Sequence, residues 1–269
     1  LEEFTATSKK PSIHFYGHTH GYSRGESRDH EHLMINVATA GGAIDYWGDW
    51  PQQDYEEYSV SEDEWGYVLV QVNAGENPKF VLKRLSLGDE YNMKYNQIVD
   101  SIEIRLNNSP PEKPICIYPT SIDSVNVNYS IVFNSSSFID DFDEHGGSHW
   151  QVSLTCDDFD SLIIDKWIQH QNIYNDERID NTNNLTSQPF IGFQPNKSYC
   201  WRVRYRDKSL KWSDWSDPTT FNTDNTPIKL KISPNPIVDE SVVSIPYYNS
   251  STVKIFNIEG KLIKTFINP

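Results

Sequence analysis

The sequence predicts a mostly β protein. Short runs rich in β-branched and aromatic residues alternate with breaks that contain Gly, Pro or Asn along the 269 residues, and this pattern is typical of strands joined by turns. Aromatic residues are abundant, with 8 Trp, 15 Tyr and 12 Phe, as expected of strand-rich domains. Outside a short segment before Pro11, the sequence has no strongly amphipathic helical pattern.

Composition excludes several function classes. The net charge of −15 argues against nucleic acid or an anionic membrane as the main partner, because both are negatively charged. No run of about 18 apolar residues, the length that crosses a bilayer, occurs. The three cysteines are odd in number and lack CxxC spacing, so we expect that they do not hold the fold together. Because the chain starts at Leu1 without a signal peptide and stops after a strand-like run, we expect a fragment of a longer protein.

Two linkers divide the chain into three expected domains. Paired prolines within residues 110–114 favour an extended connection. A polar run that ends in Pro227 forms the second linker. We therefore expect domains over residues 1–109, 110–223 and 224–269.

Five short strands are expected in the first segment. The run 66–72 (GYVLVQV) alternates cleanly between the two faces of a strand. The other runs are apolar and bounded by turn residues. The five expected strands cover residues 12–16, 32–40, 66–72, 79–87 and 97–106.

A histidine cluster is the main chemical signal, since five of the eight histidines lie within the first 32 residues. His18 and His20 follow Gly17 at the exit of an apolar strand. Neutral imidazole is a common metal ligand, and glycine lets the backbone approach a bound ion. The residues alone leave two interpretations open, a metal site or two partly exposed histidines in a turn. His14 lies inside the apolar run and is expected to be a core histidine.

The stretch 15–24 (FYGHTHGYSR) resembles the GHxH motif that closes the calcineurin-like metallophosphoesterases, especially those similar to purple acid phosphatases. The runs 33–42 (LMINVATAGG) and 63–67 (DEWGY) are similar to the end of the same domain. The resemblance covers about residues 1–106. It implies the last part of an αββα sandwich that holds a dinuclear metal centre.

By motif position, the resemblance implies His20 as a ligand of the first metal and His18 as a ligand of the second. The cofactor would be two divalent or mixed-valence metal ions (Fe, Zn or Mn), and the substrate a phosphate ester hydrolysed by a two-metal, metal-hydroxide mechanism. The family's other ligands come from Asp, GD, GNH(D/E) and a further His motif, which this sequence lacks. We therefore expect the chain alone to bind metal poorly and to be inactive.

Four further residues are candidates for substrate binding. Tyr22 and Arg24 follow the motif closely, and arginine suits phosphate recognition, although loop packing explains both residues equally well. His30 and His32 form a second HxH pair at the expected pocket rim, or a solvated loop, given their acidic neighbours. An aromatic acidic loop over 45–58 is expected to shape the pocket, to bind sugar-like groups, or to pack on the surface.

The segment 110–223 has the size of one small β-sandwich. The run 199–206 (YCWRVRYR) places apolar side chains on one face of a strand and three arginines on the other. Trp212 and Trp215 can stack between these arginines, at about 0.5–1 kcal/mol per exposed contact. This segment looks like the end of a fibronectin type III domain. It also resembles the WSxWS run of cytokine receptors, whose paired cysteines are missing, and we expect a structural ladder rather than a ligand site.

The tail opens with Pro-Asn-Pro within residues 232–236 and continues with short strands near 241–246 and 253–263, the latter broken by a hairpin turn at 257–260. It is similar to the C-terminal sorting domain of the type IX secretion system in Bacteroidetes, but stops before that pattern's further strand, so it looks truncated. The resemblance implies the type IX secretion machinery as a partner. It also implies export through periplasm and outer membrane to a secreted or cell-surface location. A small β module without a sorting role is the alternative.

The predicted fold class is therefore mostly β, with the end of an αββα metallophosphoesterase sandwich, a fibronectin type III-like β-sandwich and a small β tail. The predicted function is that of the C-terminal part of a secreted, metal-dependent phosphoesterase. A cell-surface adhesin or glycan-binding protein with a degenerate phosphoesterase-like region is the alternative, and a metal-independent scaffold similar to a receptor ectodomain is a third. Deletion of residues 110–223 is expected to leave hydrolysis of a small chromogenic ester largely intact.

Overall fold

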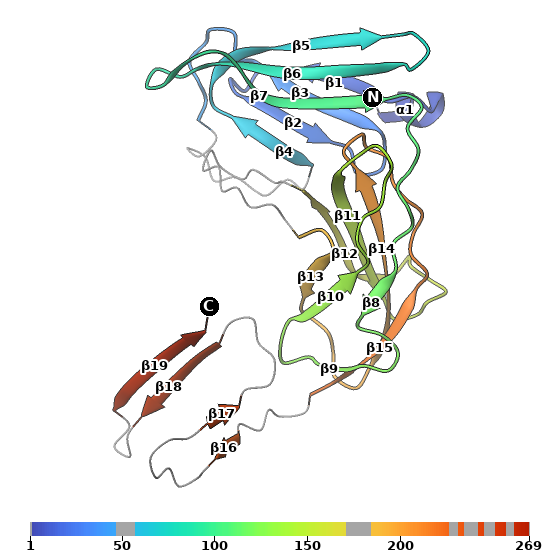
Figure 1. Cartoon of the computed structure of the whole chain (residues 1–269), viewed down its shortest axis with the longest axis vertical. Helices are drawn as coiled ribbons and strands as arrows, with labels where there is room; N and C mark the ends of the chain where they lie inside the picture. Colours follow the sequence, from blue (N-terminus) through green and yellow to red (C-terminus); the bar gives the residue numbers. More distant parts are fainter. Residues whose placement is uncertain are drawn as a thin grey trace. The chain divides into compact units, whose positions relative to one another are not determined.

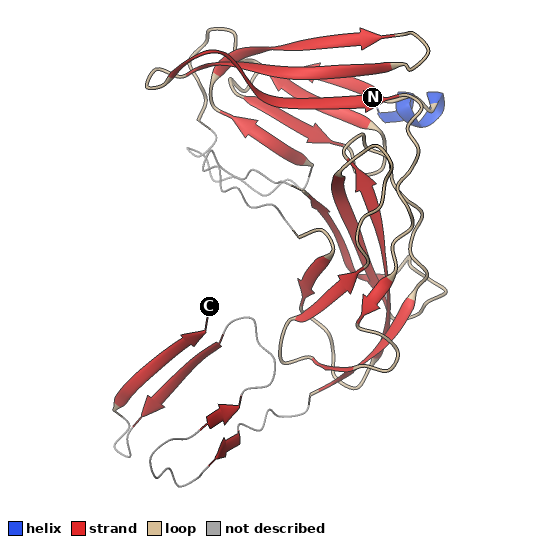
Figure 2. Cartoon of the chain, viewed as in Figure 1, coloured by secondary structure: helices blue, strands red, loops and turns tan. Residues whose placement is uncertain are grey.

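The structure is a computed structural model. It consists of two compact units, Leu1–Asp224 and Asn225–Pro269. Strands make up nearly all of the described secondary structure (Figures 1 and 2), which confirms the mostly β prediction. Within the described residues, no helix has the length and apolarity needed to cross a bilayer. The described residues are 2–46, 57–170, 184–225, 231–233, 242–244, 251–256 and 261–268.

The first sheet has four strands in the order β1-β3-β2-β4. β1 pairs in parallel with β3, and β2 lies antiparallel between β3 and β4. The short helix α1 (Glu2–Ser8) precedes β1. The bounds are β1 Ser12–Tyr16, β2 Tyr22–Glu26, β3 His32–Val37 and β4 Tyr58–Glu62.

A second sheet packs against the first. Its strands β5 (Trp65–Asn73), β6 (Lys79–Gly88) and β7 (Met93–Arg105) form an antiparallel meander, which Figure 1 shows over β1–β4. Alternate side chains of each sheet point into the shared core, where Leu33 of β3 and Leu82 of β6 are fully buried. Two sheets and one short helix are described in this segment, and the αββα sandwich of the prediction is not shown.

The next eight strands form a two-sheet sandwich. One sheet has the order β13-β10-β8, and the other has the order β12-β11-β14-β15-β9, in which β9 pairs in parallel with β15. The other pairings in both sheets are antiparallel. The bounds are β8 Cys116–Tyr118, β9 Ser124–Asn126, β10 Ile131–Ser135, β11 His145–Ser153, β12 Leu162–Gln169, β13 Ser187–Phe190, β14 Ser198–Asp207 and β15 Thr219–Asp224.

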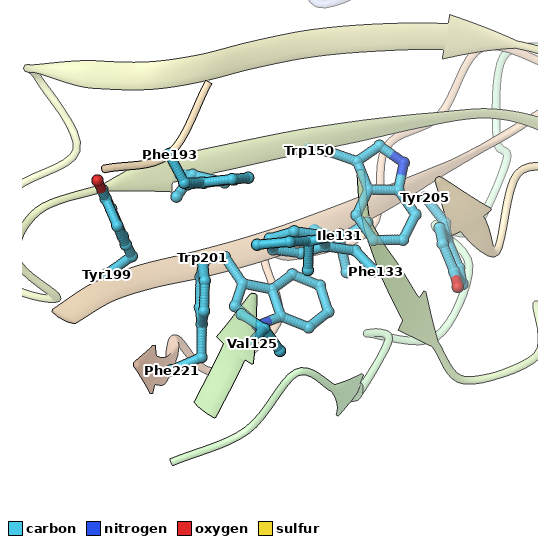
Figure 3. Close-up of a cluster of buried hydrophobic side chains, with 11 residues drawn as sticks. Val125, Ile131, Phe133, Trp150, Phe193, Tyr199, Trp201, Tyr205 and Phe221 are labelled. Atoms are coloured by element: carbon cyan, nitrogen blue, oxygen red, sulfur yellow. The ribbon is translucent and has the colours of Figure 1, made fainter. Parts of the chain in front are cut away.

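Aromatic side chains fill the core of this sandwich (Figure 3). The rings of Trp150 and Trp201 stack with centroids 5.7 Å apart, and the ring of Phe133 meets Trp201 edge-on at 5.0 Å. Such pairs contribute about 0.5–1.5 kcal/mol each beyond the area they bury. The apolar face predicted for the 199–206 run is confirmed, because Trp201, Val203 and Tyr205 of β14 are fully buried.

The expectation that cysteines do not hold the fold together is wrong. Cys156 and Cys200 form a disulfide that closes a separation of 44 residues. The bond forms because β11 and β14 are neighbours, with Ser153 paired to Cys200, so the segment after β11 passes close to Cys200. An odd count of cysteines leaves one free, which is Cys116, and burial raises the pKa of its thiol to about 11.

The second unit contains two antiparallel pairs. β16 (Lys231–Ser233) pairs with β17 (Val242–Ser244), and β18 (Ser251–Phe256) pairs with β19 (Leu262–Asn268). These pairs agree with the short strands expected in the tail. The predicted Pro-Asn-Pro opening at 234–236 and the turn at 257–260 lie outside the described residues.

Candidate functional site

The loop that leaves β1 carries His18 and His20 at the carboxyl end of a parallel strand pair. Asn36, near the end of β3, holds this loop, because its Nδ2 donates a 2.8 Å hydrogen bond to the carbonyl oxygen of Thr19. His18 adopts a φ of 111°, which is costly for a residue with a Cβ atom. Backbone strain of this kind clusters at functional sites, so the observation marks this loop as a candidate.

The imidazole of His20 has a defined orientation. Its Nδ1 lies 2.8 Å from the carbonyl oxygen of Ala43. Because a carbonyl only accepts, Nδ1 carries the proton, and Nε2 of the neutral ring keeps its lone pair. A Cβ atom on Gly42 would lie 3.1 Å from the ring, so glycine gives the ring its room. The backbone N–H of His20 donates to Asp45 Oδ2 at 2.9 Å, which fixes the loop further.

Two histidines are fewer ligands than a metal centre needs. Among the described residues, no group of three or more His, Cys, Asp or Glu side chains is placed to hold a metal ion. The imidazole donors of His18 and His20 fit Fe or Zn, whereas Mn prefers oxygen ligands. Any further ligands would have to come from outside the described residues.

Tyr22 and Arg24, predicted to bind substrate, are buried on the core side of β2, with 1% and 4% of their surfaces exposed. Asp100 of β7 accepts hydrogen bonds from Arg24 Nε at 2.7 Å, Arg24 Nη2 at 3.2 Å and the Tyr22 hydroxyl at 2.7 Å. Glu26 accepts another from Arg24 Nη1 at 2.7 Å. The structure thus places Arg24 in a buried ion pair with Asp100 that joins the two sheets, and the Tyr22 hydroxyl donates to the same carboxylate.

The electrostatics of this pair follow from its burial. Burial alone would raise the pKa of the Asp100 carboxyl, but the Arg24 charge and the hydrogen bonds from Arg24 and Tyr22 hold it below its usual value. Burial would likewise lower the pKa of Arg24, and the charges of Asp100 and Glu26 raise it instead. Both groups therefore stay ionised in the folded protein.

The placement of His32 corrects the interpretation that it lies in a solvated loop, and its role in substrate binding stays a prediction. His32 begins β3 and is 2% exposed. Its Nδ1 lies 2.7 Å from Ser12 Oγ, and burial lowers its pKa. His30 lies half-buried in the turn between β2 and β3. The ring of His14 stacks on His32 at 6.3 Å and contacts Tyr16 at 5.4 Å, in a half-buried position on β1.

The predicted aromatic acidic loop lies largely outside the described residues, which resume at Glu57. At the first end of the loop, the Asp45 side chain accepts a hydrogen bond from the backbone N–H of His20. The hydroxyl of Tyr58 lies 2.8 Å from the hydroxyl of Tyr16. Its described ends thus contact the β1 loop and β1 itself.

The arginine and tryptophan ladder predicted in the sandwich is confirmed. Arg202 lies over the ring of Trp215 at 4.2 Å, and Arg204 lies over Trp215 at 4.6 Å and over Trp212 at 4.4 Å. Arg206 lies 5.3 Å from the Trp212 ring. The stacking follows from the alternation of β14, which presents every second side chain on the same face.

The end of this ladder binds the β2–β3 turn, residues 27–31, a contact that sequence reasoning missed. Arg206 donates from Nη1 to the carbonyl oxygen of Ser27 at 2.7 Å and from Nη2 to that of His30 at 2.9 Å. Trp212 donates from Nε1 to the carbonyl oxygen of Arg28 at 2.6 Å. We call these two side chains the clamp.

Neighbouring contacts reinforce the clamp. Lys211 Nζ pairs with Glu31 at 2.6 Å, and Leu210 packs into the core between the first two sheets. Arg206 is 1% exposed, and its Nε donates to the Leu210 carbonyl oxygen at 3.0 Å. The clamp therefore ties the sandwich to the β2–β3 turn, and the expectation that deletion of residues 110–223 leaves ester hydrolysis largely intact stays a prediction.

We expect Arg206→Met to lower the free energy of unfolding by about 2 kcal/mol, because three buried carbonyl oxygens lose their charged donor while the cost of burying that charge is relieved. Urea unfolding and amide exchange of residues 27–31 measure the effect. Arg202→Met, on the same face of β14 but stacked on Trp215, is the matched control and should leave exchange in the turn unchanged. Equal protection of the turn in both variants would contradict the clamp.

The comparisons with known proteins are limited to the fold. No protein-family model and no curated protein matches the chain. Fibronectin(III)-like modules of CbhA from Clostridium thermocellum match at 8% identity over 82% of this chain and 84% of theirs, with a TM-score of 0.33. The chicken CNTN1 FN1–FN3 domains match at 8% identity over 92% of this chain and 74% of theirs, with a TM-score of 0.28.

A third solved structure, titled "Myokine structure", matches at 14% identity over 44% of this chain and 99% of its own, with a TM-score of 0.28. TM-scores in this range carry no argument by themselves. The strands β8–β15 form two facing sheets that are antiparallel except for the β9–β15 pair, and they have the buried tryptophan core and the size of such a sandwich. On those grounds, β8–β15 form a fibronectin type III-like sandwich.

Proposed function

We propose that residues 1–109 are the C-terminal part of a metal-dependent phosphoesterase domain, to which His18 and His20 contribute metal ligands. The observation that carries this proposal is the orientation of the His20 ring. A metal-binding histidine commonly donates its other N–H to a carbonyl oxygen, which fixes the ring and its tautomer. The Nδ1 contact of His20 with Ala43 is of this kind.

The strained loop supports the same proposal. His18 keeps a costly φ of 111° one residue beyond a glycine, in a loop held by the bond from Asn36 to Thr19. When bound, two metal ions would supply Lewis-acid stabilisation of phosphate oxygens. His18 and His20 would hold and orient these ions rather than move protons, and the remaining ligands would come from another part of the complete protein.

We further propose that the complete protein is exported, with the sandwich and the β tail following the hydrolase domain. The disulfide between Cys156 and Cys200 supports export, because such bonds persist in oxidising compartments. The resemblance of the tail to a type IX sorting domain supports the same route. The substrate would be a phosphomonoester or a related ester.

Zinc titration of the chain, with ¹⁵N-labelled histidines followed by NMR, tests the ligand assignment. We expect the Nε2 resonance of His20 to shift with added Zn²⁺ while Nδ1 stays protonated. His18→Ala and His20→Ala should each weaken binding by about tenfold or more, since a two-ligand site loses half its donors. His30→Ala removes an imidazole outside the β1 loop and is the matched control.

Zinc affinity that is unchanged in both His18→Ala and His20→Ala would contradict the ligand assignment. In the complete protein, His18→Ala should also lower metal content and phosphatase activity together. Full phosphatase activity with lowered metal content would show that the metal held by His18 is not needed for hydrolysis. Unchanged zinc affinity in both variants, together with no phosphatase activity of the complete protein, would favour the alternative of an adhesin or glycan-binding protein with a degenerate phosphoesterase-like region.

A further inference from the structure

A cavity of about 760 Å³ lies on the face of the first sheet opposite its core. Alternation along the strands fixes this side, because Ser23, Met34 and Asn36 line the cavity while their neighbours in β2 and β3 point into the core. Trp167 of β12 lines it from the sandwich. A volume of this size is within the usual range of small-molecule sites, roughly 300–1,000 Å³.

Two of the lining side chains carry buried polar atoms without a partner among the described residues. These atoms are Asn36 Oδ1 and Trp167 Nε1, and the two residues are 2% and 3% exposed. Exchanging the oxygen and nitrogen of the Asn36 amide would still leave an atom without a partner, because the Nδ2 position already donates to the Thr19 carbonyl oxygen. An unpaired buried polar group costs about 1–3 kcal/mol, so each atom favours a bound partner.

The two atoms have complementary needs. Asn36 Oδ1 accepts a hydrogen bond, and Trp167 Nε1 donates one. A hydroxyl group both donates and accepts, so a ligand that carries several hydroxyls satisfies both atoms. The hydroxyls of Tyr16 and Tyr58, which lie 2.8 Å apart at the wall of the same cavity, add groups of the same kind.

The charge of the lining disfavours anionic ligands. Among the described residues that line the cavity there are three carboxylates and one guanidinium, and that guanidinium, of Arg28, already pairs with Asp29 at 3.1 Å. A phosphate or carboxylate ligand would meet net repulsion there. The carboxylates accept hydrogen bonds from neutral hydroxyls without such a cost. The three carboxylates belong to Glu2, Asp29 and Glu57.

We propose that this cavity binds a neutral, polyhydroxylated ligand, a unit of a glycan. Asn36 accepts a hydrogen bond from one of its hydroxyls, and Trp167 donates one to another. The site uses neither His18 nor His20, so it stands whether or not the chain takes part in phosphoester hydrolysis. The cavity lies between the first sheet and the sandwich, within the unit Leu1–Asp224.

Calorimetric titration of the chain with neutral trisaccharides built on glucose, mannose, galactose and N-acetylglucosamine tests the proposal. We expect saturable binding of at least one of them, and weaker binding of glucose 6-phosphate. The titration is run with EDTA present, so that its result is independent of any metal at the β1 loop. Binding of no neutral trisaccharide, or preference for the phosphorylated sugar, would overturn the proposal.

Variants locate the ligand. Trp167→Phe keeps a ring but removes the N–H, and it should weaken binding roughly fivefold, the value of one hydrogen bond. Trp215→Phe makes the same change in the ladder, outside the cavity lining, and should leave the affinity unchanged. Tyr58→Phe, which removes one hydroxyl from the cavity wall, gives a second test if Trp167→Phe unfolds. Equal losses at Trp167 and Trp215, or full affinity in both cavity variants, would show that the ligand binds elsewhere.

Discussion

Replacement of Asp100 by alanine is expected to destabilise the unit Leu1–Asp224 by about 3–5 kcal/mol. The carboxyl group accepts bonds from Arg24 and Tyr22 between two sheets, and both partners of the ion pair have side chains at most 7% exposed. Its removal leaves a guanidinium in the core whose remaining acidic partner, among the described residues, is Glu26. Urea unfolding followed by tryptophan fluorescence measures the loss.

The double variant Arg24→Met, Asp100→Leu separates the cost of an unpaired charge from the value of the pair. Because burying both charges is itself costly, an apolar replacement of the pair is expected to recover most of the stability lost in Asp100→Ala. A double variant no more stable than Asp100→Ala would mean that packing, and not the unpaired charge, accounts for the loss.

The same pair predicts an acid-sensitive stability. The pKa of Asp100 in the folded protein lies below its ordinary value near 3.8. A depressed carboxyl pKa contributes stability above the unfolded-state value, and this contribution is lost as the pH falls through the folded-state value. The stability of the wild type should therefore drop below about pH 4, and Asp100→Ala should show a shallower drop. Parallel pH profiles would contradict this assignment.

The second large effect is expected at the disulfide. Cys156→Ser opens a cross-link between residues 44 apart, and loop-closure entropy predicts a loss of about 3–4 kcal/mol. Reduction of the wild type should shift the urea midpoint in the same direction. Cys116→Ser, which alters a free thiol, is the matched control and should not respond differently to reductant from the wild type. A wild type whose urea midpoint is unchanged by reduction would show that the cross-link does not stabilise the folded state.

Much of the strand content could be predicted from sequence, because buried strands leave apolar runs. β1, β3, β5, β6 and β7 were expected within a few residues of their observed bounds. β2 (YSRGE) and β4 (YSVSE) were not, since their sequences are mostly polar. Their polar side chains are buried by tertiary contacts, such as that between Arg24 and Asp100, which local periodicity does not report.

Some features of the candidate site could likewise be predicted from the sequence, and others could not. The exit of β1 placed His18 and His20 on one loop, as a strand followed by glycine predicts, and the alternation of β14 predicted the ladder. The burial of Arg24 could not be read from its neighbours, because its partner is 76 residues away. The disulfide was not predicted for a related reason. The pairing of β11 with β14 brings Cys156 and Cys200 together, and the number of cysteines does not reveal this pairing.

The two side chains of the clamp bind the β2–β3 turn through its main chain. Arg206 and Trp212 donate to carbonyl oxygens of Ser27, Arg28 and His30, groups that every amino acid carries. The clamp itself therefore places little constraint on the side chains of the turn. Glu31, which pairs with Lys211, and Asp29, which lines the cavity, are constrained by other contacts. In a family of related sequences, this arrangement predicts a variable turn next to a conserved arginine and tryptophan in the sandwich.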